Sequence, residues 1–344
     1  MRKHTLYLLS VLVVASLVLS ACASASTPVP TTVAEPATET SLTEAPTAEP
    51  QPTEEPLSGT ISVSGAFALY PMMTVWAEEF TKLHPNVQFD VQGGGAGKGM
   101  TDTIAKAVDI GMISRSIKDE ETAQGIFWVS VTKDAVFPII SSENPVADQI
   151  MAKGISQEVF SKIYITGEIT TWGEVVGDPS ITDEINVFTR SDASGAAEQW
   201  AKYAGGKAQE DLLGIGVNGE PSMVDTVIKD PLGIGYGNLN SIFDLSGGGL
   251  VPGIIIPPLD INGNGQADPE EIYTVKDDAF GAVANGTYPS PPARFENLAT
   301  FGKPTGLVLA FIEWILTDGQ QYLEAAGFVP LTPEQQAESL AKIK

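Results

Sequence analysis

The feature of this sequence that most constrains its fold is a strand–loop–helix unit that recurs after Gly59. In each unit an apolar run precedes a loop of small residues, and a helical pattern follows the loop. Three such loops, rich in Gly, Ser and Ala, are Ser64–Phe67, Gly93–Gly99 and Ser191–Ala196. Repeated units of this kind predict an α/β fold with a mainly parallel sheet, whose ligands bind at the carboxyl ends of the strands.

The first part of this region predicts three strands and two helices. Strands are expected at 60–63, 87–91 and 109–114. One helix begins near Tyr70, and a second ends near Ala107. The first helix carries an apolar stripe at helical spacing, which indicates a face turned toward a core. The stripe consists of Met72, Trp76, Phe80 and Leu83.

The remainder of the chain predicts a second lobe. Gly125–Ile140 is long, apolar and rich in Val, Ile and Phe, as expected of a strand that passes between two lobes. Further strands are expected at 185–189 and 232–236, and an amphipathic helix at 307–326. We therefore predict a two-lobed clamp, in which each lobe is a mainly parallel sheet flanked by helices. Lobe 1 is expected to comprise 59–137 and 253–344, lobe 2 to comprise 138–252, and the crossings to lie near Val136–Ile140 and Val251–Ile256.

The amino terminus has the pattern of an export signal. Arg2 and Lys3 precede an apolar run from Leu6 to Leu19, which is shorter than the roughly twenty residues of a transmembrane helix. The run ends in the sequence LSAC, which resembles the lipobox of lipoproteins. We predict a signal peptide at 1–21 and a lipid on Cys22, the only cysteine of the chain. A buried free thiol is the alternative for that residue.

The segment after Cys22 cannot bury a core. Residues 23–58 hold seven Pro, eight Thr and six Glu and neither Lys nor Arg, so prolines and like charges keep the segment extended. We predict that 22–58 is a lipidated, disordered tether. The mature protein is expected to be extracytoplasmic, without a spanning helix, and lipid-anchored to the outer face of the cell membrane, which is the periplasmic side if the cell has an outer membrane.

Charge and histidine content exclude several functions. Lys and Arg total 19 against 43 Asp and Glu, a formal net charge of -24, so a basic face for nucleic acid or anionic lipid is not expected. His4 lies in the predicted signal peptide, which leaves His84 as the one histidine of the mature chain. A multi-histidine metal centre and cysteine–histidine catalysis are therefore excluded.

The three small-residue loops are candidates for binding an anion. The first N–H groups of a helix have no intrahelical partner, and the helix dipole adds partial positive charge to them. Arg115 and Arg190 each follow a predicted strand, and a guanidinium grips an oxyanion through charge-assisted hydrogen bonds. A plain tight turn is the alternative for any one loop. A nucleotide-binding P-loop fits badly, because Gln92 stands where its first glycine belongs.

Six segments, taken in their order and spacing, carry a family resemblance over most of 59–331. They are SGAFALYP at 64–71, GGGAGKGM at 93–100, DIGMISRSIKDEE at 109–121, ITGEITTWGEV at 165–175, FTRSDASGAAEQW at 188–200 and GIGY at 233–236. The chain resembles the phosphate-binding lipoproteins of ABC transporters, within the type II periplasmic binding proteins. The resemblance implies a monomeric, non-catalytic receptor that closes two lobes on an oxyanion and delivers it to an ABC permease, with no cofactor for transport and no nucleic-acid partner.

The resemblance also assigns residues to the anion site. They are Ala66, Phe67, Gly95, Ala96, Gly97, Lys98, Ser114, Arg115, Arg190, Ser194, Gly195 and Ala196. Arg190 is the strongest candidate, and Asp192 is expected to orient it. Ala196 stands where the family has threonine, and Ser114 falls where some members have an aspartate that accepts the phosphate proton. Selectivity among phosphate, sulfate and arsenate therefore stays open, as does a small phosphorylated solute.

A secreted phosphatase or other hydrolase is the competing class of function. Ser194 is a conceivable nucleophile, but its segment lacks the second glycine of a G-x-S-x-G elbow. His84 lies beside Pro85 at a predicted helix end, and the sequence offers no two-metal ligand cluster. We therefore predict that the protein is not an enzyme.

A separate motif predicts a structural Ca²⁺ ion. Residues 260–271 match D-x-[DN]-x-[DN]-G-x₅-E at every fixed position. The predicted ligands are Asp260, Asn262, Asn264, the backbone carbonyl of Gln266, Asp268 and Glu271. The flanks do not look like two long helices, so we expect a lone loop and not an EF-hand pair. An acidic turn favoured by the two Asn-Gly pairs is the alternative.

Overall fold

The computed structural model describes residues 56–344. The predicted signal peptide at 1–21, the predicted lipid on Cys22 and nearly all of the predicted tether at 22–58 lie outside the described residues. Among the residues that are described, no helix combines the length and the apolar composition that crossing a membrane requires.

One mixed sheet runs through the folded region, in the strand order β2-β1-β3-β11-β4-β8-β6-β7, with β9 paired to β4 at the side. The strands are β1 Gly59–Gly65, β2 Val87–Gly93, β3 Ile110–Ile113, β4 Ile126–Ser141, β6 Asn186–Arg190, β7 Ile215–Val217, β8 Gly233–Asn238, β9 Ile254–Ile255 and β11 Ala293–Phe301. The strands β1, β2 and β3 are parallel, as are β6, β7 and β8. Each lobe is thus built on a mainly parallel set of strands, as predicted. A separate parallel pair joins β5 Ile155–Ser156 to β10 Leu259–Asp260.

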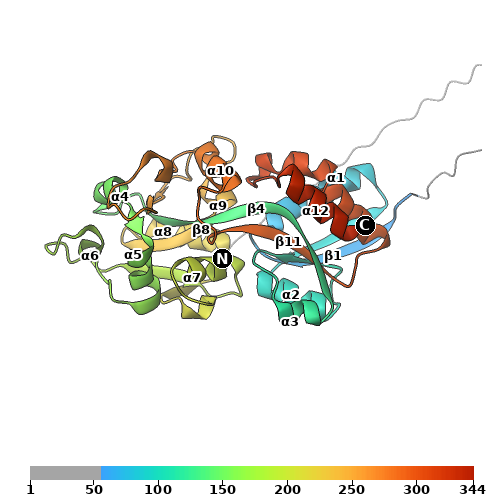
Figure 1. Ribbon diagram of the computed structural model, residues 1–344, viewed down its shortest axis with the longest axis horizontal. Coiled ribbons are helices and arrows are strands. Elements are labelled where there is room, and N and C mark those ends of the chain that lie inside the picture. Colours follow the sequence, from blue (N-terminus) through green and yellow to red (C-terminus); the bar gives the residue numbers. More distant parts are fainter. Residues whose placement is uncertain (1–55) are drawn as a thin grey trace, which may run out of the picture. The chain divides into compact units, whose positions relative to one another are not determined.

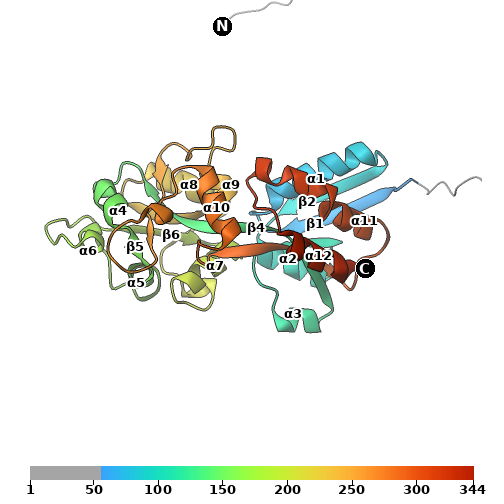
Figure 2. The same cartoon turned by 45° about the horizontal axis from the view of Figure 1, so that its top comes forward.

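Two antiparallel strands connect the lobes. The 16-residue β4 runs from one lobe into the other, and β11 pairs with its first half from Ala135↔Ala293 to Ile126↔Phe301. The second half of β4 pairs with β8 instead. Figures 1 and 2 show β4 and β11 side by side between the two lobes. These two strands form the connection between the lobes.

Helices flank both halves of the sheet. They are α1 Tyr70–Leu83, α2 Ala96–Ile104, α3 Asp119–Ala123, α4 Ala147–Lys153, α5 Gln157–Ser161, α6 Trp172–Val176, α7 Gly195–Tyr203, α8 Glu220–Lys229, α9 Leu239–Ile242, α10 Lys276–Asn285, α11 Gly306–Ile315 and α12 Pro333–Ile343. Pro71 lies in the first turn of α1, where its missing N–H costs nothing. The helix predicted at 307–326 ends at Ile315 and is followed by short 3₁₀ turns at 318–322 and 324–326.

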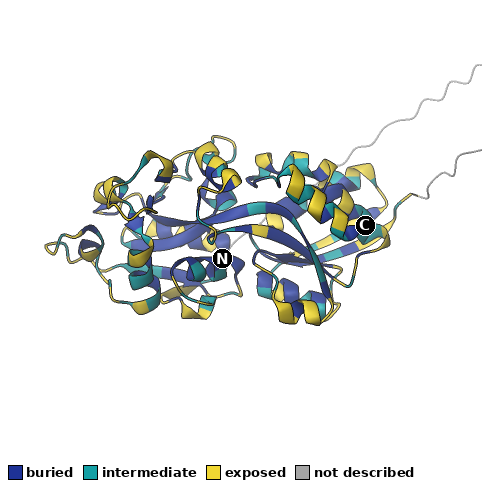
Figure 3. Ribbon diagram, in the orientation of Figure 1, coloured by how far each residue is buried: buried dark blue, intermediate teal, exposed yellow. Residues whose placement is uncertain are grey.

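Each lobe has its own hydrophobic core. In the first lobe, Trp76 and Phe80 of α1 pack with Phe311 and Trp314 of α11. Three members of the predicted α1 stripe are buried, whereas Leu83 at the helix end is exposed. In the second lobe the largest buried side chains are Phe137, Phe160, Tyr164, Trp172, Trp200, Tyr236 and Tyr288. Figure 3 shows that the connecting strands are largely buried as well.

The predicted return crossing near Val251–Ile256 is wrong, and with it the lobe boundary at 252/253. Buried residues from Ile254 to Tyr288 belong to the core of the second lobe. The apolar run there forms the short strand β9, which pairs with Ile140 and Ser141 of β4. The chain returns to the first lobe only with β11. The outward crossing also differs slightly, since β4 leaves the first core after Val131 and enters the second at Ala135.

Candidate functional site

The three small-residue loops meet at one point between the lobes. The loop after β1 leads into α1, the loop after β2 into α2, and the loop after β6 into α7. A small cavity with a volume of about 10 Å³ lies where they converge, enough for the centre of about one water-sized group. It is lined by Ala66, Phe67, Ala68, Gly95, Ala96, Ser114, Arg190, Ser194, Gly195, Ala196 and Asn238. The cavity is thus a narrow space enclosed by the loops of both lobes.

Backbone donors dominate the lining of this cavity. The helices α2 and α7 are nine residues long, and their first residues, Ala96 and Gly195, both face it. Their N–H groups lie in the first turn, where no intrahelical acceptor exists. Ser194 caps α7 by accepting the N–H of Ala197 at 3.3 Å. The arrangement places the amino-terminal ends of two helices at the cavity, which favours a negative charge there.

Arg190 supplies the positive side chain of the site. Its guanidinium donates to Asp192 at 2.7 and 2.6 Å and to Glu220 at 2.6 Å, and its side chain is 2% exposed. Burial opposes the charged form, but Glu220 and Asp192 hold the pKa of Arg190 above its ordinary value. The two carboxylates therefore keep the guanidinium charged and fixed, as predicted for Asp192. Three of its five N–H groups are engaged, which leaves two for a ligand.

The lobes approach so closely at this cavity that only glycine fits at several positions. A Cβ on Gly195 would overlap Ser114 of the other lobe, and a Cβ on Gly95 would overlap the carbonyl oxygen of Ala193. The N–H of Gly97 donates to that same Ala193 oxygen at 3.2 Å. These contacts describe lobes that are closed against each other at the site.

Nine of the twelve predicted site residues line the cavity, and three do not. Gly97 is occupied by the contact with Ala193, and the partly exposed Lys98 pairs with Asp102. Arg115 is buried, but its guanidinium donates to Glu121 at 2.6 and 3.0 Å and lies 3.4 Å from Glu198 of the second lobe. The pair formed by Arg115 and Glu198 thus links the two lobes beside the cavity.

Sequence reasoning missed two lining residues, Ala68 and Asn238. Ala68 lies one residue beyond the end of the predicted first loop, Ser64–Phe67. Asn238 is the last residue of β8 and stands two positions after the GIGY segment. Its position at the carboxyl end of a strand is the signal by which the sequence could have identified it.

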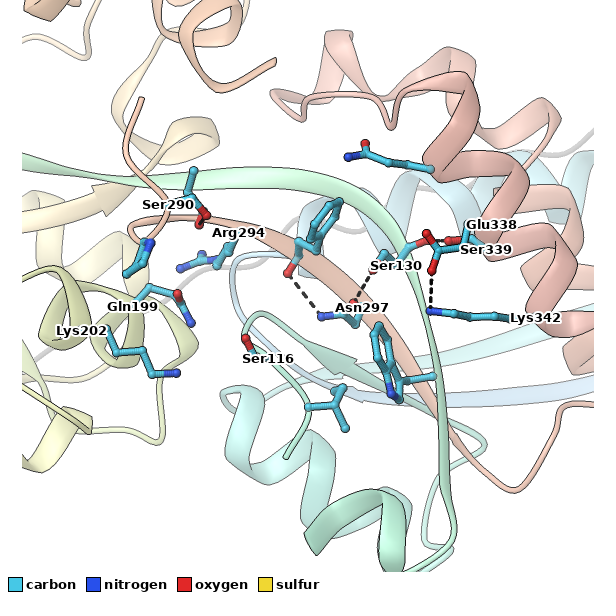
Figure 4. Close-up of a pocket in the computed structure, with 16 residues that line it drawn as sticks. Ser116, Ser130, Gln199, Lys202, Ser290, Arg294, Asn297, Glu338, Ser339 and Lys342 are labelled. Atoms are coloured by element: carbon cyan, nitrogen blue, oxygen red, sulfur yellow. Dashed lines mark hydrogen bonds and ion pairs between the residues drawn. The ribbon is translucent and has the colours of Figure 1, made fainter. Parts of the chain in front are cut away.

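A larger cavity of about 490 Å³ lies at the connecting strands. Figure 4 shows Gln199, Lys202 and Arg294 on one side of it and Asn297 in the middle, next to Ser130. Glu338, Ser339 and Lys342 of α12 lie on the opposite side. Most of its charged groups are already paired, since Lys202 contacts Glu198 and Lys342 contacts Glu338. We therefore place the anion site in the smaller cavity, where the donors converge.

Arg294 is the centre of a buried charged cluster between the lobes. Its guanidinium donates to Asp134 at 2.9 Å, to Glu296 at 2.9 Å and to the side-chain oxygen of Asn238 at 2.6 Å. Burial raises the pKa of Glu296 to about 8 and that of Asp134 to about 6, although the neighbouring Arg294 lowers both. The cluster connects β4, β11 and the end of β8, and it reaches the anion cavity through Asn238.

The predicted calcium loop forms a compact turn after β10. Asp260 accepts the N–H groups of Asn264 and Gly265, both at 3.0 Å, and Glu271 accepts the N–H of Ile261 at 2.7 Å. Asn262 and Asn264 donate to Asp268 at 2.6 and 2.9 Å. The loop is therefore closed by hydrogen bonds among its own side chains and backbone. Across residues 56–344, no group of three or more His, Cys, Asp or Glu side chains is gathered closely enough to hold a metal ion.

The chain is similar to several proteins that are named as phosphate-binding proteins. The phosphate-binding protein PstS of Bacillus subtilis is 28% identical over 281 residues, which are 81% of this chain and 83% of the relative. PstS of Pseudomonas aeruginosa PAO1 is 27% identical over 315 residues, 83% of this chain and 87% of the relative. A crystal structure from Clostridium perfringens, described as a phosphate ABC transporter substrate-binding protein with bound phosphate, is 25% identical, with a TM-score of 0.62 over 80% of this chain and all of that one.

The match extends to a family model. The model of the PBP superfamily domain aligns with residues 50–319, which is well over half of the sequence. The two-lobed α/β architecture and the cavity between the lobes agree with it. The chain therefore belongs to the PBP superfamily.

Proposed function

We propose that this protein is a receptor that binds phosphate, or a similar oxyanion, between its lobes and delivers it to an ABC permease. The observation that carries the proposal is the position of Arg190 in a cavity lined by the amino termini of two helices. The relatives named above are phosphate-binding proteins, and one holds phosphate. The proposed role is that of a receptor and not of an enzyme, because the relatives are binding proteins of transporters.

The residues suggest how the anion is held. Two N–H groups of Arg190 and the N–H groups that begin α2 and α7 surround the ligand with donors from both lobes. Because Gly95 and Gly195 let the lobes touch, closure excludes water and strengthens each of these bonds. Opening about β4 and β11 would then expose the anion to the permease. The lining contains no Asp or Glu, and the amide oxygen of Asn238 already accepts from Arg294, so the side-chain acceptors left for a ligand are the hydroxyls of Ser114 and Ser194.

The proposal also covers the location of the protein and its oligomeric state. A lipid on Cys22 and the 22–58 tether would hold the receptor at the outer face of the cell membrane, near its permease. The LSAC sequence and the Pro-, Thr- and Glu-rich composition support this part. We propose that the receptor works as a monomer, since one chain supplies both lobes of the clamp.

Calorimetry on the full-length protein, freed of bound ligand, tests the proposed function. Titration with phosphate, sulfate, molybdate and a phosphonate should show micromolar or tighter binding of phosphate. Incubation with a phosphate ester should show no turnover. No heat with phosphate, together with clear binding of a sugar or an amino acid, would overturn the proposal.

The proposal includes a structural Ca²⁺ ion in the 260–271 loop. Its side-chain donors are all oxygens, which is the chemistry that Ca²⁺ prefers, and their spacing follows the calcium-loop pattern. Asp260 and Glu271 are buried, and each accepts backbone N–H groups of the loop, which fixes both carboxylates in place. Occupancy of the loop would stabilise only the folded state.

Thermal unfolding tests the ion. Calcium should raise the melting temperature of the parent protein relative to chelator, and the double variant Asp260→Ala, Glu271→Ala should lose that rise. Asp178→Ala is the matched control, because Asp178 also closes an exposed turn through Ser180 but lies outside the motif. Identical unfolding of the parent in calcium and in chelator would show that the motif is only a turn.

A further inference from the structure

The side chain of Asn238 has an unusual set of partners. Asn238 ends β8 and occupies the N-cap position of α9, where asparagine ordinarily caps the helix with its side chain. Here the side chain makes no cap hydrogen bond. Its oxygen accepts from Arg294 at 2.6 Å instead, and its Nδ2 has no hydrogen-bond partner among the described residues. The residue is 0% exposed, yet it lines the anion cavity.

The orientation of this amide is fixed by its neighbour. A guanidinium only donates, so Arg294 requires the carboxamide oxygen of Asn238 and not its nitrogen. The backbone N–H of Asn238 is held by Glu220 at 2.6 Å, which prevents the residue from turning away. The NH₂ group is therefore the part of the side chain left for the cavity. Buried polar groups in folded proteins almost always have a partner, so this one calls for an acceptor.

We propose that Asn238 is a further ligand of the bound anion and donates a hydrogen bond to it from Nδ2. This inference rests on the proposed function. The anion then accepts from Asn238 at the end of β8 and from Arg190 at the end of β6. Because the oxygen of Asn238 stays on Arg294, and Arg294 also binds Asp134, the same amide connects the anion to both connecting strands, β11 and β4. Ligand binding thereby completes a chain of hydrogen bonds between the cavity and the strands that join the lobes.

The amide also bears on which oxyanion is accepted. Asn238 adds a donor to a cavity whose lining contains no carboxylate. Sulfate carries no proton and accepts at all four oxygens, whereas phosphate near neutral pH carries at least one proton to donate. Asn238→Asp keeps the shape and replaces the NH₂ by an oxygen that accepts. The variant should therefore disfavour sulfate more strongly than phosphate.

The experiment uses the full-length protein and calorimetric titration with inorganic phosphate and with sulfate. The variants are Asn238→Ala and Asn238→Asp. Asn144→Ala is the matched control, because Asn144 is also buried and does not line the cavity, and its Nδ2 likewise has no partner within residues 56–344. Its oxygen accepts the N–H of Val146 at 3.0 Å. Unfolding of the anion-free proteins is followed in parallel, so that a loss of affinity can be separated from a loss of stability.

We expect Asn238→Ala to weaken phosphate binding at least about tenfold and Asn144→Ala to leave it unchanged. Asn238→Asp should raise the ratio of phosphate to sulfate affinity at least about tenfold, a readout that a change in stability alone does not move. If the parent binds phosphate and the folded Asn238 variants match it in affinity and in this ratio, the inference is overturned while the proposed function stands. If the parent binds no phosphate, the proposed function fails first and the inference with it.

Discussion

Replacement of Arg190 is the sharpest test of the anion site. The guanidinium has two N–H groups beyond those that bind Asp192 and Glu220. A hydrogen bond to a charged group contributes about 1.5–3 kcal/mol, so Arg190→Ala should weaken phosphate binding by at least about 2 kcal/mol, roughly thirtyfold. The loss should exceed this minimum, because Asp192 and Glu220 would then present unpaired negative charge to the anion.

The same substitution perturbs the fold, and the assay has to separate the two effects. Removing one partner of a buried ion pair costs about 3–5 kcal/mol of stability. Titration of phosphate is therefore combined with thermal unfolding of the anion-free protein, and Arg190→Lys is measured beside Arg190→Ala. The lysine keeps the charge but not the planar fork that grips Asp192, so its affinity should lie between those of the parent and the alanine variant.

Arg115→Ala provides the comparison for this experiment. Arg115 is also buried and paired with carboxylates, but it does not line the cavity. We expect it to destabilise the protein while weakening phosphate binding far less than Arg190→Ala. If folded Arg190→Ala binds phosphate as the parent does, Arg190 does not touch the anion and the geometry argued for the site is wrong.

Two further predictions follow from burial and from close packing. Burial raises the pKa of Glu296 from its ordinary 4.5 to about 8, so the folded protein holds a proton that the unfolded chain releases. The free energy of unfolding should therefore fall as pH rises between these two values. Glu296→Gln should make the melting temperature depend less on pH over this range. Equal pH profiles of melting temperature for variant and parent would contradict this. A Cβ on Gly195 would overlap Ser114, so Gly195→Ala should hold the lobes apart and weaken phosphate binding about tenfold without lowering the melting temperature of the anion-free protein; unchanged affinity by calorimetry would show that the lobes need not meet there.

The elements with strong local signals were predictable from the sequence. The α/β class, the strands before the three loops and the helix bearing Trp76 and Phe80 are confirmed by the structure, because apolar periodicity and small-residue loops are local properties. The convergence of the three loops was expected from the family resemblance, because two of them follow strands of the first lobe and the third follows a strand of the second.

The strand β11 gave no such signal. Arg294, Glu296 and Asn297 interrupt its pattern, although all three are buried. They are accommodated by partners far away in sequence, such as Asp134 for Arg294 and Ser130 for Asn297. A buried polar strand cannot be distinguished from an exposed segment without those partners. For this reason the sequence predicted the return of the chain to the first lobe at the apolar run 251–256, and not at β11.

The position of Arg115 beside the cavity, and not in its lining, could not be predicted for a similar reason. Arg115 follows a strand just as Arg190 does, and nothing local distinguishes them. In the structure Arg115 forms ion pairs with Glu121 and with Glu198, and Glu198 belongs to the other lobe. The sequence around Asn238 is compatible with an ordinary helix cap. Only the structure shows that its side chain accepts from Arg294 instead. Such assignments depend on which groups the tertiary fold brings together.

The insertion of β11 between β3 and β4 has a consequence for the order in which the chain can fold. The second lobe is one uninterrupted stretch, with buried residues from Ala135 to Tyr288 apart from Val329, which joins it from the carboxyl-terminal part. The first lobe needs both ends of the described chain, because Leu298 and Ile343 share a core with Ile61. Closing so long a loop costs entropy before any contact is gained. As the chain emerges amino terminus first, the second lobe can assemble alone, whereas the first waits for the final helix, so half of the clamp exists before there is anything for it to close against.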